Sequence, residues 1–197
     1  MGEDFEVMHT AVKPYHSCRC NHAAIDAVLQ LVLEHELNYF DIARIDIQMD
    51  QFSTNLVGSP EIVRKTPINV VDGQFSIYFA AAVSAVEGQF SWSSYDRLGD
   101  PTIQDLLQRV YTSVDGSVPP LGARVTITTV NGEPFIRDVP LPRGEPEDFL
   151  TWQECQSKFR GLAKGILDDD GMDQVVNTVM ELDRLDNIKD LTRLLRS

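Results

Sequence analysis

Residues 23–37 are apolar almost throughout, and their main polar exceptions recur at every fourth position, as Asp26, Gln30 and Glu34. Side chains four positions apart lie on one face of an α-helix, so this spacing predicts a helix with one narrow polar stripe. Asn21 precedes the run and belongs to a residue type that caps helix N-termini. We therefore expect a helix that is buried everywhere except along the stripe.

Two further helices are predicted by apolar clusters with suitable end signals. The cluster at residues 75–88 combines bulky side chains with alanines, follows Asp72 as a cap and ends at Gly88. The next helix is expected from Pro101 to about Arg109, because proline is tolerated in the first helical turn.

A β-hairpin gives the clearest short signal in the chain. Residues 124–130 alternate apolar and polar types, Asn131-Gly132 is typical of a two-residue hairpin turn, and residues 135–139 return. Pro134 removes a backbone donor, so the returning strand should be shortened or lie at a sheet edge.

Two more strands are expected outside the hairpin, at residues 5–12 and at residues 41–49. The second contains three isoleucines, a residue type enriched in strands. Together with the helices, these strands predict the α+β class, with helices packed on a short antiparallel sheet.

The composition changes at residues 140–146, where prolines and a glycine predict a linker. This divides the chain into an α+β region at 1–142 and a helical segment at 143–197. The helical signals of that segment are the capping-box spacing of Thr151 and Glu154 and the apolar patterns of residues 172–183 and 188–195. Their apolar side chains need a cover, either from the α+β region or from a partner.

Composition restricts the function. A chain of 197 residues with 43% hydrophobic residues can bury a core, and its net charge of -13 disfavours nucleic acid and anionic membranes as partners. The odd number of cysteines, three, favours reduced thiols over a disulfide framework. The apolar run at residues 75–86 is too short to span a membrane, and the acidic start is unlike a signal peptide, so we expect a cytoplasmic protein.

One basic cluster stands out against this acidic background. Residues 12–22 contain Lys13, His16, Arg19 and His22 and no acidic residue. The cluster leads directly into the first predicted helix, whose N-terminal amides attract anions. We expect a small anion to bind here.

Three blocks of the sequence resemble the MmgE/PrpD family. They are Lys13-Pro14-Tyr15-His16-Ser17-Cys18-Arg19 with Asn21-His22-Ala23-Ala24-Ile25-Asp26, then Asp72-Gly73-Gln74-Phe75-Ser76-Ile77, and finally Gly144-Glu145-Pro146 with Leu150-Thr151 and Lys158-Phe159. The blocks occur in the family's order. Two departures are His16, where proline is usual, and Cys18, where some dehydratases and decarboxylases carry histidine.

The resemblance implies a C-terminal lid region, which in the family follows a large helical domain that this chain does not contain. It implies a lyase that acts on a small di- or tricarboxylate, such as a 2-methylcitrate dehydratase or a cis-aconitate decarboxylase, or else an epimerase of a related diacid. It implies no cofactor and no metal. The expected partners are the polycarboxylate, a second copy of the chain in a homodimer, or a helical-domain protein. A noncatalytic lid subunit is the alternative from another functional class.

The site residues follow from the basic cluster and the resemblance. Lys13 and His22 are the predicted catalytic residues, because a carbanion next to a carboxylate needs a nearby cation and a proton carrier. The predicted substrate-binding residues are Ser17, Cys18, Arg19 and Gln74. We expect Asp26, four residues after His22, to orient the imidazole ring.

Each assignment has a structural alternative. If they have no functional role, Lys13 is a solvated residue and Arg19 is a member of a surface ion pair. His22 is then simply the start of the polar stripe. Gln74 is otherwise a cap-region side chain bonded to its own backbone. The alternation of His16, Cys18, Cys20 and His22 suggests zinc as a rival, but structural zinc ligands usually come in pairs two to four residues apart.

Overall fold

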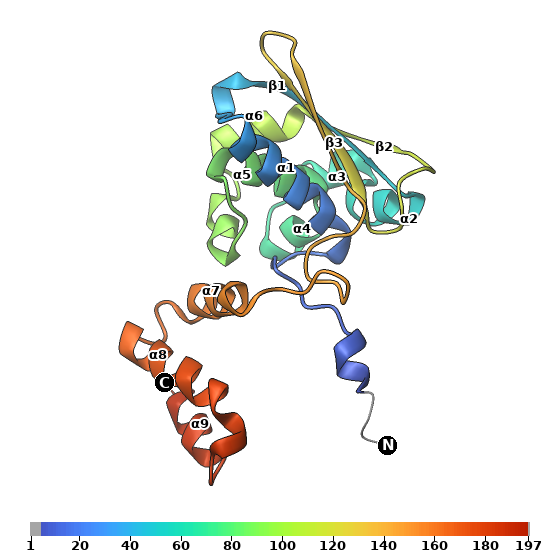
Figure 1. Cartoon of the computed structure of the whole chain (residues 1–197). Helices are drawn as coiled ribbons and strands as arrows, with labels where there is room; N and C mark the ends of the chain where they lie inside the picture. The colour runs from blue at the N-terminus through green and yellow to red at the C-terminus, as the bar shows by residue number, and fades with distance from the viewer. Residues whose placement is uncertain (1–4, 197) are drawn as a thin grey trace. The chain divides into compact units, whose positions relative to one another are not determined.

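The computed structural model describes residues 5–196, which form two compact units that meet in sequence between Phe149 and Leu150 (Figure 1). The stretch at residues 140–146, predicted as a linker, belongs to the first unit. Its backbone is tied to that unit by hydrogen bonds described below, so its prolines shape a packed loop.

The first unit is built around a four-stranded sheet in the order β2-β1-β3-β4. The strands are β1 (Ile42–Met49), β2 (Val110–Val114), β3 (Ala123–Thr129) and β4 (Pro134–Val139). The predicted α+β class is confirmed, but the prediction of an antiparallel sheet is wrong for one pair, because β2 runs parallel to β1. Only Val110 of β2 is buried, so the strand lacks the alternation that marks strands in a sequence.

The hairpin of β3 and β4 is confirmed, with Ile127 opposite Phe135. Its loop has three residues, not the predicted two, because Thr129 and Glu133 close it through a 2.9 Å bond from the Thr129 amide to the Glu133 carbonyl. Gly132 takes the left-handed conformation, with φ 84°, that this loop type requires. β4 lies at the sheet edge, as Pro134 predicts.

Helices complete the first unit. The main ones are α1 (His22–Glu34), α5 (Ile77–Glu87) and α6 (Pro101–Gln108), and the shorter helical elements are η1 (Glu6–His9), η2 (Arg19–Asn21), η3 (Tyr39–Asp41), α2 (Gln51–Ser53), η4 (Thr54–Gly58), α3 (Glu61–Arg64), α4 (Val70–Gln74) and η5 (Trp92–Arg97). α1 packs against β3, β4 and α5, and α5 packs against α6 (Figure 1). Residues 77–85 of α5 are buried, and their alanines allow this close packing.

The helix predictions hold in position: α6 begins at Pro101 as predicted, α1 ends three residues before its predicted end, and α5 differs in its N-terminal cap. α5 is capped by the Ser76 hydroxyl, since Asp72 lies inside the separate helix α4. Gly88 ends α5 in the left-handed conformation as predicted. The strand predicted at residues 5–12 is wrong: the segment contains η1, which has no buried residue and therefore no sheet to join.

The second unit contains α7 (Trp152–Ala163), α8 (Asp169–Met180), η6 (Leu182–Arg184) and α9 (Lys189–Leu194). The predicted capping box is confirmed, with the Thr151 amide 2.6 Å from the Glu154 carboxylate. α8 begins three residues before its predicted start because Asp168 caps it. Within residues 5–196, no helix has the length and apolar character needed to cross a membrane.

Candidate functional site

The segment before α1 folds around one backbone atom, the carbonyl oxygen of Ser17. The Lys13 ammonium donates to this oxygen at 3.3 Å, and the Nε2 atom of His22 lies 3.4 Å from it. The two residues predicted to be catalytic therefore contact the same acceptor, although they are nine positions apart in the sequence.

Solvent exposure separates these two residues. Lys13 is exposed, whereas His22 has no exposed surface and Ser17 is 5% exposed. Lys13 is therefore open to solvent, whereas the imidazole of His22 is buried against Ser17. Direct proton transfer by His22 stays a prediction that requires this segment to open.

Arg19 is bound to an acidic residue of the chain itself. Its Nε atom donates to the Glu145 carboxylate at 2.7 Å, and its Nη2 atom contacts the same oxygen. Its Nη1 atom lies 3.1 Å from Nδ1 of His22 and donates to the Arg143 carbonyl at 3.0 Å. Glu145 thus occupies two donors of Arg19, a residue predicted to bind the substrate, so a substrate carboxylate must displace Glu145 or bind elsewhere.

The Asp26 carboxylate connects the first turns of α1 to the loop after β4. Its oxygens accept from the Tyr15 hydroxyl at 2.6 Å and from the Arg143 amide at 3.0 Å. We expected this carboxylate to orient His22, but its oxygens bind Tyr15 and Arg143, and the contacts of the ring include Arg19, Ser17 and the ring of Tyr15. Burial raises the pKa of Asp26, and the two hydrogen bonds oppose this shift only in part.

Cys18 and Cys20 form a pair of unlike thiols. A hydrogen bond from the Cys20 thiol, with smaller effects from the Cys20 amide and from the charges of Lys13 and Arg64, lowers the pKa of Cys18 to about 6 against the opposing effect of burial. The same hydrogen bond and burial raise the pKa of Cys20. Cys18 is partly exposed and Cys20 is buried, so Cys18 is the thiol that can meet a ligand.

Gln74 holds the segment before α1 from the side of α4. Its carbonyl oxygen accepts from the Cys18 amide at 2.9 Å and from the side-chain amide of Asn21 at 3.0 Å. Its own side-chain amide donates to the His16 carbonyl at 3.3 Å. Asn21 occupies the N-cap position of α1 as predicted, but its side chain makes this contact and no capping hydrogen bond.

Glu145 and Tyr15 are the site residues that sequence reasoning missed as functional candidates. Both lie in the blocks that resemble the family, but the segment around Glu145 was interpreted as a linker. Figure 1 shows this loop after β4 beside the segment that precedes α1, and the Val12 amide donates to the Gly144 carbonyl at 2.8 Å. The signal in the sequence was the glycine at position 144, because glycine marks backbone conformations that other residues avoid. In the structure Gly144 has φ 91°.

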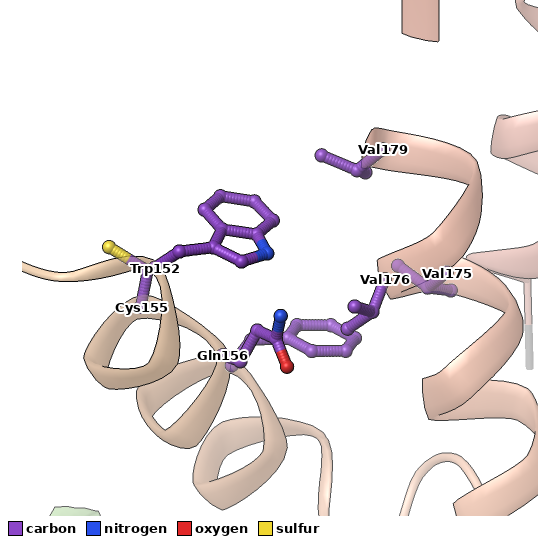
Figure 2. A pocket seen from close by; sticks show the side chains of 7 residues that line it. Trp152, Cys155, Gln156, Val175, Val176 and Val179 are labelled. Atoms are coloured by element: carbon purple, nitrogen blue, oxygen red, sulfur yellow. The ribbon is translucent and has the colours of Figure 1, made fainter. Parts of the chain in front are cut away.

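The second unit carries an open apolar pocket of about 200 Å³ between α7 and α8. It is lined by Trp152, Cys155, Gln156, Phe159, Val175, Val176 and Val179 (Figure 2). The indole of Trp152 stands over the pocket and is 43% exposed. No group of three or more His, Cys, Asp or Glu side chains suited to a metal ion occurs within residues 5–196.

Comparisons with known proteins agree with the resemblance described above. The chain is 27% identical over 210 aligned positions to a cis-aconitate decarboxylase of Aspergillus terreus, which covers 99% of the chain and 42% of that relative. It is 24% identical over 139 positions to the cis-aconitate decarboxylase of Mus musculus, which covers 68% of the chain and 28% of that relative. The chain therefore spans less than half the length of these curated relatives.

The family model described as the MmgE/PrpD C-terminal domain matches residues 15–182. This range contains α1, the whole sheet and the helices α7 and α8. The match covers most of the chain, and it includes every predicted site residue except Lys13. The chain therefore belongs to the MmgE/PrpD family and carries its C-terminal domain.

Proposed function

We propose that this chain is the substrate-capping part of an MmgE/PrpD lyase that acts on a small di- or tricarboxylate, with cis-aconitate as the first substrate to test. The observation that carries the proposal is the gathering of Lys13 and His22 on the Ser17 carbonyl oxygen, next to Arg19. The family and the names of the relatives support the reaction class.

The proposed chemistry needs a positive group beside a carboxylate. When a carbon–carbon bond to a carboxyl group breaks, carbon dioxide leaves, the electron pair stays on the carbon, and a proton must then be delivered there. An exposed ammonium at Lys13 can stabilise the developing negative charge and donate that proton. In a chain with a net charge of -13, such a cationic site also sets the place where a polycarboxylate can approach.

Epimerisation of a related diacid is the nearest alternative. An epimerase removes a proton from the carbon next to a carboxylate and returns a proton to the opposite face, so the same kind of carbanion forms but no carbon–carbon or carbon–oxygen bond breaks. Proton NMR in deuterated water separates these outcomes: a lyase consumes its substrate, whereas an epimerase inserts deuterium and retains the carbon skeleton.

The test is an assay of the chain alone and together with any helical MmgE/PrpD segment encoded beside it, with cis-aconitate, 2-methylcitrate and a diacid epimerase substrate. We expect Lys13→Met to abolish turnover and Lys189→Met, a change at an exposed lysine of α9, to preserve it. Absence of substrate loss and of deuterium uptake with all three substrate types would reject the enzyme proposal.

A noncatalytic subunit that binds a helical partner is the second candidate function. The apolar pocket between α7 and α8, with the exposed indole of Trp152 above it, favours this reading (Figure 2). Light scattering of the purified chain tests it. Concentration-dependent self-association that Trp152→Ser reduces would support a surface that needs a partner, and a monomer that binds no hydrophobic dye would count against it.

A further inference from the structure

Glu145 binds Arg19 of the basic cluster, although 126 positions separate the two residues. We infer that Glu145 is a positioning residue: it holds Arg19 so that His22 keeps its proton on Nε2 and thereby fixes the Ser17 carbonyl that orients Lys13. This inference rests on the proposed function for its catalytic meaning. The contacts among Glu145, Arg19, His22 and Ser17 themselves involve no substrate.

The donors of Arg19 are divided between two directions. Nε and Nη2 point to the Glu145 carboxylate, and Nη1 points to the Arg143 carbonyl and to Nδ1 of His22. A guanidinium has a planar, rigid set of donors, so binding one edge to a carboxylate fixes the direction of the remaining ones. Glu145 therefore determines where the Nη1 donors of Arg19 lie.

The position of Nη1 determines the tautomer of His22. Arginine only donates hydrogen bonds, so Nδ1 must accept and the ring proton must reside on Nε2. That proton faces the Ser17 carbonyl oxygen at 3.4 Å. In the other tautomer, an N–H would face Arg19 and a lone pair would face the carbonyl oxygen, and both contacts are repulsive.

Burial strengthens the dependence of His22 on Arg19 and Glu145. The side chains of Arg19 and Glu145 are 14% and 16% exposed, and His22 is fully buried, so water replaces their mutual hydrogen bonds poorly. The loop cannot carry Glu145 away easily, because the Arg143 amide is bound to Asp26 and the Gly144 carbonyl to the Val12 amide. The Ser17 carbonyl then holds the Lys13 ammonium at 3.3 Å.

The test is long-range proton–nitrogen NMR of His22 in the full chain, compared among wild type, Glu145→Gln, Glu145→Asp and Asp148→Asn. We expect wild type to show an unprotonated Nδ1. In Glu145→Gln, its resonance should move toward that of a protonated nitrogen, and Glu145→Asp should restore much of the wild-type value. Asp148→Asn is the matched control, because its carboxylate pairs with Arg143 in the same loop.

Two results would overturn the inference. One is a wild-type spectrum with the proton of His22 on Nδ1, which decides the question even if Glu145→Gln does not fold. The other is a folded Glu145→Gln variant whose His22 resonances match wild type. Because no substrate is needed, a normal tautomer response in a chain without turnover would reject the proposed function alone. In an active enzyme, Glu145→Gln should lower kcat more than it raises KM.

Discussion

Replacing Gly144 by alanine should destabilise the first unit by about 3–5 kcal/mol, well beyond the usual effect of a single surface substitution. Gly144 has φ 91°, and a Cβ atom built on it would lie 2.0 Å from the Val12 carbonyl oxygen and 3.2 Å from Cδ of Pro14. The left-handed backbone alone costs an alanine about 1–2 kcal/mol. The overlap with a backbone oxygen cannot be relieved by a side-chain rotation, so the loop must move.

Moving the loop breaks further contacts. The bond from the Val12 amide to the Gly144 carbonyl is worth about 0.5–1.5 kcal/mol. The adjacent pair of Arg19 and Glu145 is mostly buried, and weakening it costs on the order of 1–2 kcal/mol more after allowance for its partial exposure. These effects together give about 2.5–5.5 kcal/mol, which brackets the expected loss of about 3–5 kcal/mol.

Two other glycines provide matched controls. Gly132 has φ 84° and no atom within 4 Å of an added Cβ, so Gly132→Ala should cost only the backbone contribution of about 1–2 kcal/mol. At Gly116 no atom lies within 4 Å of an added Cβ and the backbone is not left-handed, so Gly116→Ala should hardly change the free energy of unfolding. Urea denaturation followed by far-UV circular dichroism measures all three variants. A Gly144→Ala variant no less stable than Gly132→Ala would refute the proposed docking of the loop.

Two further predictions concern pH. The pKa of Cys18 is lowered to about 6, so its rate of alkylation by iodoacetamide should rise through about pH 6 and level off by about pH 8. Peptide mass spectrometry measures this rate. A rate that still rises toward pH 9.0, the ordinary pKa of a cysteine thiol, would contradict the lowered pKa. Burial raises the pKa of Asp26 above 3.8, so its stabilising contribution is fully present below that pH and is lost as the pH rises through the raised pKa. The difference in unfolding free energy between wild type and Asp26→Asn should therefore decrease with rising pH, and a constant difference in urea denaturation would argue against the raised pKa.

Features with local causes were predictable from the sequence. α1, α5, α6 and the hairpin depend on apolar periodicity and on end signals such as Gly88 and Pro101, all of which lie within or beside the elements themselves. The basic cluster was visible for the same reason, since its residues are close in sequence.

Features that depend on distant partners were not predictable. β2 becomes a strand because Val110 pairs with Ile45, although its own pattern shows little alternation. The pairing of Arg19 with Glu145 joins two segments that no local pattern connects, so Arg19 was assigned to a substrate. The burial of His22 behind Ser17 likewise follows from packing, which periodicity alone does not reveal.

Binding of an organic acid by the cationic groups that precede α1 can be measured by amide NMR during titration with tricarballylate, a stable tricarboxylate. We expect saturable shifts of the amides of residues 13–22, with an affinity that Lys13→Met lowers at least tenfold and Lys189→Met leaves unchanged. Absence of these shifts at millimolar ligand, or equal binding by Lys13→Met and wild type, would contradict this expectation.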